Sequence, residues 1–193
     1  MKYLIGSHNS CSYATPKKWY MKLFHFAARC QEVNIKTQYE KYDVRVFDIR
    51  IKVDKYYNVE ICHGLISFDI DIKDVLHYFN SKKDCYCRII LEDNLNTPNG
   101  KDKRTRFIKI CRIIEQDYPN IKFFGGIAKY PWGEKLYDFN NNNIELDDNY
   151  SSVKAPKLID DLYPRWYASK NNKYIYAAGT NKQCLFIDFV NIK

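Results

Sequence analysis

The chain has 193 residues, of which 46% are hydrophobic and 28% are charged, and its formal net charge at pH 7 is +8. This composition predicts a single globular domain over residues 1–193, and the lack of any stretch near roughly 18 apolar residues argues against a membrane-spanning helix. The positive charge favours an anionic partner: nucleic acid, a phospholipid surface or a phosphate-bearing substrate.

The N-terminal stretch and the cysteines both bear on the cellular compartment. The opening letters, MKYLIGSHNSCSY, turn polar too early for the apolar core of a secretory signal. The seven cysteines are an odd set without regular spacing, and no second ligand pair accompanies Cys85 and Cys87 to make a zinc site. We therefore expect a cytoplasmic protein with reduced, mostly buried thiols.

Strand-like and helix-like segments alternate in the first half of the chain. Apolar runs predict strands over 3–8, 44–53 and 58–64. Apolar spacings of three and four predict helices over 16–40 and 70–80. The stripe of the first predicted helix consists of Trp19, Leu23, Phe26 and Ala27.

The second half continues the alternation and then weakens. Residues 85–93 and 121–128 read as strands on either side of a helix over 104–117. The basic run at 100–106 is interpreted as a solvated helix face, so no nucleic-acid partner is expected. Beyond it we expect a polar loop over 138–149, a short helix over 156–164, and strands in the segments RWYAS, KYIYAA and CLFIDFVN.

Strands that alternate with helices predict an α/β fold with a parallel sheet and helices outside. Seven or eight strands without a glycine-rich nucleotide loop favour a compact, distorted TIM (β/α) barrel over an open sheet. At this length some outer helices must be missing. The link of about six residues between the last two predicted strands is too short for a crossover helix, so irregularity is expected there.

Polar side chains recur near the ends of these strands, on faces whose earlier residues are apolar or small. They are His8, Asp48, Arg50, His63, Glu92 and Asp188. In a barrel such side chains converge on one mouth, where active sites are built. Taken singly, each has a plainer reading: a loop histidine, a buried ion pair, or an acid at a helix N-terminus. His25 and His77 lie within predicted helices and are interpreted as structural or solvated.

Two histidines and an arginine together suit phosphodiester cleavage. One histidine removes a proton from an attacking hydroxyl, and the other protonates the leaving oxygen. A guanidinium neutralises phosphoryl oxygens through two parallel hydrogen bonds.

Three sequence blocks carry a resemblance to a known family. The segments IGSHNS (5–10), TQYEKYDVRVFDIRI (37–51) and VEICHG (59–64) resemble the X region of phosphatidylinositol-specific phospholipase C-like phosphodiesterases, which are distorted TIM barrels. RIILEDN (88–94) is similar to a later strand of that family, and the match is specific over about residues 3–94. The closing segments are only loosely similar.

The resemblance implies roles for the matched residues. His8 matches the general base that deprotonates the inositol 2-hydroxyl, and His63 matches the general acid for the leaving group. Arg50 stands where calcium-dependent members of the family bind the metal, so the bacterial, metal-independent type is favoured and no cofactor is expected. Strand alternation, apart from the resemblance, puts Asp48 on the same face as Arg50, where it would hold the guanidinium in orientation.

Two departures leave a calcium-dependent type open. Asn9 is similar to the calcium-type residue at its position, and Glu92 falls near a calcium-ligand position. With Asp48 they could hold a cation if Arg50 turned away; otherwise Asn9 and Glu92 are expected to contact substrate.

Asp188 and the later aromatic residues complete the expected site. In a closed barrel the last strand adjoins the first, so Asp188 could orient His8 as the buried acid does in hydrolase triads; the alternative is a surface acid on a frayed strand. Arg165 and Trp166 are candidates for stacking on a sugar ring or dipping into lipid.

The sequence therefore predicts a monomeric phosphodiesterase, a hydrolase or lyase of lipid metabolism. It would cleave phosphatidylinositol-type phospholipids or related phosphodiesters, with peripheral contact to a membrane surface. One alternative is a non-catalytic barrel that binds phosphoinositide or phosphate. Another is a metal-dependent phosphodiesterase of the glycerophosphodiester or sphingomyelinase D type, although such enzymes usually show E-x-D where this chain has D-I-R.

Overall fold

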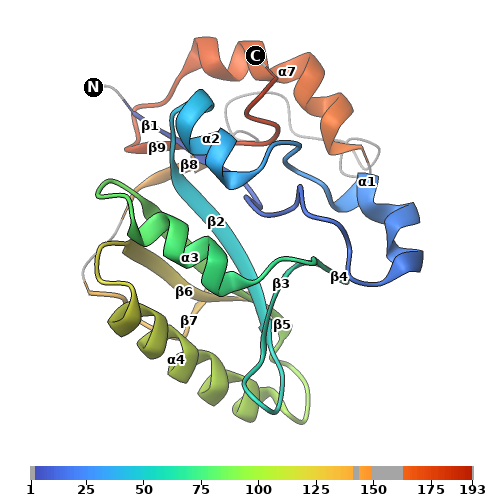
Figure 1. The fold of residues 1–193 in the computed structure, drawn as a ribbon, viewed down its shortest axis with the longest axis vertical. Coiled ribbons are helices and arrows are strands. Elements are labelled where there is room, and N and C mark those ends of the chain that lie inside the picture. Colours follow the sequence, from blue (N-terminus) through green and yellow to red (C-terminus); the bar gives the residue numbers. More distant parts are fainter. Residues whose placement is uncertain (1–2, 141–143, 149–162, 193) are drawn as a thin grey trace.

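The computed structural model describes residues 3–140, 144–148 and 163–192, and its centre is one mixed sheet (Figure 1). The strands, in chain order, are β1 (Leu4–Ser7), β2 (Val44–Val53), β3 (Val59–His63), β4 (Ile66–Ser67), β5 (Tyr86–Asn94), β6 (Lys122–Tyr130), β7 (Glu134–Lys135), β8 (Leu146–Asp148) and β9 (Cys184–Ile187). In space they run in the order β7-β6-β5-β2-β1-β9-β8, and the antiparallel hairpin β3–β4 branches from β2.

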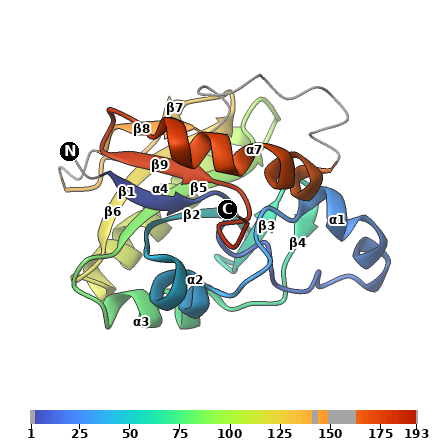
Figure 2. The same cartoon turned by 90° about the horizontal axis from the view of Figure 1, so that it is seen from above.

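Helices cover the outer face of this sheet, and in Figure 2 the strands lie between α7 on one side and α2 and α3 on the other. The described helices are η1 (Trp19–Phe24), α1 (His25–Ala28), α2 (Ile35–Tyr42), α3 (Ile72–Asn80), α4 (Gly100–Asp117) and α7 (Pro164–Ala178). Among the described residues no helix is long and apolar enough to cross a bilayer.

Strand β2 shows how sequence alternation sorts the two faces of the sheet. Phe47, Ile49 and Ile51 point to the helix side and are fully buried in the main core. Because successive side chains of a strand alternate, Val46, Asp48 and Arg50 point to the opposite, concave side. The predicted boundaries of this strand, 44–53, are confirmed.

A smaller apolar cluster fills the base of the concave side. Val46, Phe124, Cys184 and Phe186 pack there, below the polar ends of their strands. Gly6 in β1 leaves room for this packing, because a Cβ at that position would lie 2.8 Å from both Cys184 Sγ and Phe186 Cδ1. The polar side chains of the neighbouring strands therefore rest on an apolar floor.

The expected closed barrel is found only in part. The sheet has the α/β composition and the parallel run β6-β5-β2-β1-β9-β8. Within the described ranges, however, no pairing joins β7 to β8, so the sheet is open between its two terminal strands.

The prediction of one helix over 16–40 is wrong. The segment divides into η1, α1 and α2, and Asn34 starts the last of these by accepting a hydrogen bond from Thr37 N at 2.9 Å. Trp19 and Leu23 remain 76% and 71% exposed. The apolar stripe therefore faces outward instead of covering the sheet.

The strands predicted in RWYAS and KYIYAA are also wrong, because both segments belong to α7. Pro164 stands in the first turn of this helix, and Gly179 with φ +60° ends it. Along the chain, α7 lies between the parallel strands β8 and β9, so it is a crossover helix. The expectation that no crossover helix precedes the last strand is therefore also wrong. The predicted loop over 138–149 contains β8, and the predicted helix over 156–164 lies almost wholly outside the described residues.

Candidate active site

The loop after β1 places two of the predicted residues, and it is fixed to β2. Asn9 has φ +45°, a left-handed conformation that asparagine tolerates better than most residues. Its backbone N–H donates to Asp48 Oδ2 at 3.2 Å. Ser10 exchanges two more bonds with the same strand residue: its N–H donates to Asp48 O at 2.9 Å, and its Oγ accepts from Asp48 N at 2.8 Å. The turn therefore places the His8 ring near Asp48, with 3.8 Å between His8 Nε2 and Asp48 Oδ2.

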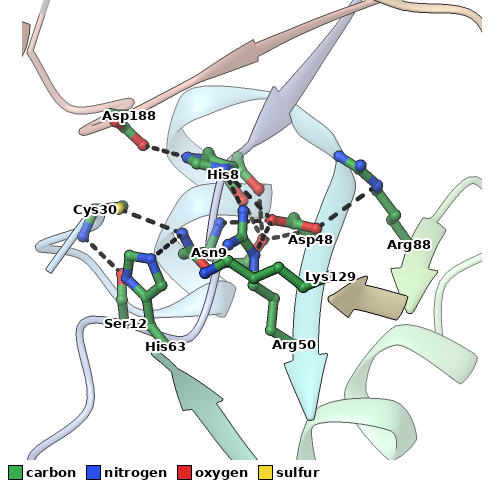
Figure 3. A network of polar contacts seen from close by, with 12 residues as sticks. His8, Asn9, Ser12, Cys30, Asp48, Arg50, His63, Arg88, Lys129 and Asp188 are labelled. Carbon is green, nitrogen blue, oxygen red and sulfur yellow. Dashed lines mark hydrogen bonds and ion pairs between the residues drawn. The ribbon is translucent and has the colours of Figure 1, made fainter. Parts of the chain in front are cut away.

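His8 lies between a carboxylate and a guanidinium (Figure 3). Its Nδ1 is 3.0 Å from Asp188 Oδ1, and its Nε2 is 2.5 Å from Arg50 Nη2. Since the carboxylate accepts and the guanidinium donates, the hydrogen of the neutral ring is on Nδ1 and the lone pair is on Nε2. This ring is therefore set up to take a proton at Nε2.

Arg50 is the buried cation of the site. Its Nε donates to Asp48 Oδ2 at 3.2 Å, and its Nη1 lies 3.6 Å from Glu92 Oε2. These two carboxylates, on β2 and on the neighbouring strand β5, fix the guanidinium from two sides. The Arg50 guanidinium therefore borders the same space as His8 Nε2.

His63 enters from the hairpin that branches off β2. Its Nδ1 is 2.8 Å from Ala28 O, so this nitrogen carries a hydrogen. Its Nε2 lies 3.4 Å from Asn9 Nδ2, on the side of the network that contains Arg50 and His8. The two predicted histidines thus reach one site from different walls, and Asn9 lies between them.

The pKa values of the two histidines shift in opposite directions from the usual value. Burial acts to lower the pKa of His8, but the Asp188 carboxylate opposes this, and with Asp48 it holds the pKa above its usual value in spite of Arg50. Burial and the charge of Arg50 lower the pKa of His63 to about 4. Burial would raise the pKa of Asp48, but Arg50, Arg88 and His8 outweigh it and bring that pKa to about 2.

Asp188 is held by a strained turn and by two buried amides that sequence reasoning missed. The next residue, Phe189, has φ +49°, which is costly for a bulky side chain and is typical of functional sites. Asn172 Nδ2 donates to Asp188 O at 2.8 Å. Gln31 Nε2 donates to His8 O at 3.1 Å and to Ile187 O at 2.9 Å. These bonds fix the end of β9 against the end of β1.

Two further basic residues of the site were also missed. Lys129 on β6 donates to Glu92 Oε1 at 2.5 Å, and the same oxygen accepts from Gly64 N at 2.7 Å. Arg88 on β5 has its Nε 3.9 Å from Asp48 Oδ1. Strand alternation could have found Arg88, which lies on the face of Glu92 and four residues before it.

An apolar pocket of about 450 Å³ opens beside His63. It is lined by Met21, Phe24, Ala27, Ala28, His63, Gly64, Leu65 and Ile66. One side of the His63 ring therefore faces a polar, charged network, and the other faces a surface suited to hydrocarbon.

Arg165 and Trp166 lie in the first turn of α7, outside the charged network. The Arg165 guanidinium pairs with Glu32, and Trp166 is half-exposed with Lys170 Nζ 3.3 Å from its ring centre. Tyr163 stacks on Phe26 of α1 with 5.4 Å between ring centres, so the start of α7 adjoins the segment that lines the pocket.

The two histidines interpreted as structural are indeed outside the network. His25 Nε2 lies 2.8 Å from Ser12 O. His77 packs edge-on against Tyr118, with ring centres 5.2 Å apart.

Two sets of side chains could hold a metal. The oxygens Asn9 Oδ1, Asp48 Oδ1 and Glu92 Oε2 are buried without a hydrogen-bond partner in the described part of the chain, but the two carboxylates face Arg88 and Arg50 at ion-pair distances. The second set is His8, Cys30 and Asp188, whose ligand atoms all lie within 4.8 Å of one another.

Comparison with known proteins finds the same fold in solved structures. No protein-family model and no curated protein matches the sequence. The phosphatidylinositol-specific phospholipase C from Listeria monocytogenes aligns with a TM-score of 0.61 and 17% identity, over 96% of this chain and 87% of that chain. A mutant of the enzyme from Staphylococcus aureus gives a TM-score of 0.60 and 17% identity, over 96% and 84%. A further S. aureus structure, concerned with modulation of membrane binding, gives 0.54 and 15%, over 96% and 85%.

Proposed function

We propose, from the fold that this chain shares with bacterial phosphatidylinositol-specific phospholipases C, that it is a metal-independent phosphodiesterase. It would cleave phosphatidylinositol-type phospholipids and release a cyclic inositol phosphate. The observation that carries the proposal is the position of His8, between Asp188 at Nδ1 and Arg50 at Nε2.

His8 is assigned the general base. Its Nε2 lone pair takes the proton of the inositol 2-hydroxyl, whose oxygen then attacks the phosphorus of the same molecule. Asp188 stabilises the imidazolium that forms, because the two are already joined through Nδ1. Arg50 directs its donors at the phosphoryl oxygens, where charge develops.

His63 is assigned the general acid. As the bond from phosphorus to the glycerol oxygen breaks, Nε2–H of His63 delivers its proton to that oxygen. The apolar pocket beside the ring supports this assignment, since the leaving diacylglycerol carries hydrocarbon chains. The two alternative functions, a non-catalytic barrel and an acid-pair metal phosphodiesterase, lack an observation of this kind.

Metal independence rests on Arg50. Arginine remains protonated at working pH, and here Asp48 and Glu92 hold it in place. A calcium ion among Asn9, Asp48 and Glu92 would meet this fixed charge at short range. The guanidinium therefore supplies the positive charge that a metal would otherwise bring.

The test uses the purified chain and phosphatidylinositol vesicles, with and without EDTA, followed by ³¹P NMR. We expect cyclic inositol phosphate at the same rate under both conditions. Arg50→Lys keeps the charge but loses the planar pair of N–H donors, so it should lower turnover by about 100-fold or more. Arg45→Lys, at a surface ion pair with Asp43, is the matched control. Activity that disappears on chelation and returns with calcium would reassign Asn9, Asp48 and Glu92 as metal ligands.

A further inference from the structure

Cys30 lies next to the proposed base, although the proposed mechanism gives it no role. Its Sγ is 3.5 Å from Asn9 Nδ2, and it belongs with His8 and Asp188 to the set whose ligand atoms lie within 4.8 Å of one another. In Figure 3 the Cys30 sulfur, the Asp188 carboxylate and the His8 ring gather on the side of the network away from Arg88. A thiol, an imidazole and a carboxylate are the three kinds of ligand that zinc takes in proteins.

The backbone around these three ligands is fixed before any ion arrives. Cys30 N donates to Ser12 Oγ at 2.9 Å, and Cys30 O accepts from Phe189 N at 2.6 Å. The bonds of Gln31 and Asn172 hold the backbone at His8 and Asp188. Fixed ligands are what a tight metal site requires, because little ordering remains to be done on binding.

We propose that His8 Nδ1, Cys30 Sγ and the Asp188 carboxylate form a binding site for a zinc ion that switches off the general base. The part of this proposal that concerns inhibition rests on the proposed function. No ligand pair marks the site in the sequence, because its members come from three segments that are far apart along the chain.

Distances and charges are both compatible with zinc. Ligands of one tetrahedral zinc ion lie about 3.5 Å apart, so side-chain shifts of about 1 Å suffice to close the set around the ion. A thiolate and a carboxylate balance the two positive charges of zinc. Calcium, which prefers oxygen ligands, gains nothing from the sulfur. His8 is the most exposed member, with its side chain 15% accessible, so an ion enters past its ring.

Protons are conserved in the binding step. The thiol proton of Cys30 passes to water as the Zn–S bond forms. The hydrogen on His8 Nδ1 leaves that nitrogen as the Zn–N bond forms and returns to the ring at Nε2. The new Nε2–H then faces the N–H donors of Arg50, which lie 2.5 Å away, so the guanidinium must turn aside. Zinc therefore removes the lone pair that takes the substrate proton and also displaces Arg50.

Cobalt(II) reports the site directly, because a cobalt–thiolate bond gives an intense near-ultraviolet charge-transfer band. We expect this band at one cobalt per chain, its loss in Cys30→Ala, and its displacement by zinc. The matched control is Cys111→Ala, which removes a buried thiol from α4 and should leave the band unchanged. In turnover assays, the zinc concentration for half-inhibition should rise by more than about 10-fold in Cys30→Ala, since loss of a ligand should cost no less than the 10–100-fold of an outer-shell change.

The spectrum and the assay separate the two proposals. A band that is missing, or one that persists in Cys30→Ala, overturns the zinc site whatever the activity. A chain that binds cobalt through Cys30 but does not cleave phosphatidylinositol upholds the site and refutes the proposed function. Zinc inhibition that is equal in the native chain and in Cys30→Ala refutes the role of this site in switching off the base.

Discussion

The pKa values of His8 and His63 shift in opposite directions, although both side chains are assigned to one proposed reaction. Burial is the largest influence on the pKa of His8 and lowers it, but the charge and hydrogen bond of Asp188 together with the charge of Asp48 hold this pKa above its usual value. Burial and Arg50 bring the pKa of His63 to about 4. At neutral pH, His63 is therefore uncharged before substrate binds, yet a general acid needs its proton. The negative charge of the bound phosphodiester must therefore raise the pKa of His63, so that the ring is protonated when substrate is bound.

This argument predicts a ligand-linked change at His63. An NMR titration of the ring should give a pKa near 4 in the free protein and a clearly higher value in the presence of a non-cleavable inositol phosphate, because an anion favours the charged ring. A His63 titration that is the same with and without the ligand would contradict the assignment of this ring as the acid.

Substitutions at the two histidines should have effects that depend on the leaving group. His8→Ala and His63→Ala should each lower turnover of phosphatidylinositol by about two to four orders of magnitude. With a nitrophenyl leaving group, His63→Ala should lose much less activity than His8→Ala, because nitrophenolate departs without a proton. If His63→Ala lost as much activity on the nitrophenyl substrate as on phosphatidylinositol, the assignment of His63 as the acid would be wrong. Circular dichroism should show that both variants remain folded.

At the scale of elements, η1 presents apolar side chains to solvent beside the pocket at His63. Trp19 and Leu23 lie on η1, and Phe24 of the same element lines the pocket. Loss of one large apolar side chain from a lipid-buried position costs about 1.5–3 kcal/mol. We propose η1 as a second candidate for the peripheral membrane contact expected from the sequence, beside the aromatic residues of α7.

Trp19→Ala and Leu23→Ala should each lower partitioning onto phosphatidylinositol vesicles by about tenfold or more, as measured by sedimentation. Cleavage of a soluble, short-chain substrate should stay near the native rate, since neither side chain touches the charged network. Tyr56→Ala is the control, because Tyr56 is 72% exposed in the turn between β2 and β3 and does not line the pocket. If all three variants bound vesicles equally well, η1 would not be the contact.

The elements also show which parts of the fold can be predicted from the sequence. Strand β2 was predictable because Val44–Val53 alternates cleanly and has core contacts on both faces. Helix α7 was missed because its tryptophan, tyrosines and isoleucine are residue types that favour strands. Its buried set, Tyr167, Ala168, Asn172 and Ile175, follows helical spacing that a periodicity count would have favoured.

Some residues of the candidate site could likewise be predicted from the sequence, and others could not. His8, Asp48, Arg50, His63 and Asp188 could be named because each is polar at the end of an apolar strand, and the structure brings them together. Gln31 and Asn172 could not, because they act through backbone carbonyls of distant segments, and no local pattern predicts such partners. Lys129 was missed for a similar reason: its partner Glu92 lies on the adjacent strand.

At the scale of the whole molecule, most of the candidate site lies on the parallel part of the sheet. The strands that carry His8, Asp48, Glu92 and Asp188 or lead into them are parallel neighbours, β9, β1, β2 and β5. His63 comes from the antiparallel branch β3, so the acid enters from outside this parallel run. The apolar pocket proposed for the leaving group therefore lies beside the parallel strands, where η1 meets the hairpin β3–β4.

The burial of every thiol has a practical consequence for labelling. All seven cysteines are free and buried, so maleimide dyes find no native sulfhydryl on the surface. A single cysteine introduced in place of Leu23 would carry a fluorophore alone, and one in place of Tyr56 would carry the reference label. Quenching of each dye by brominated lipids would then measure how deeply that point of the surface sits in the bilayer, with the native cysteines left in place.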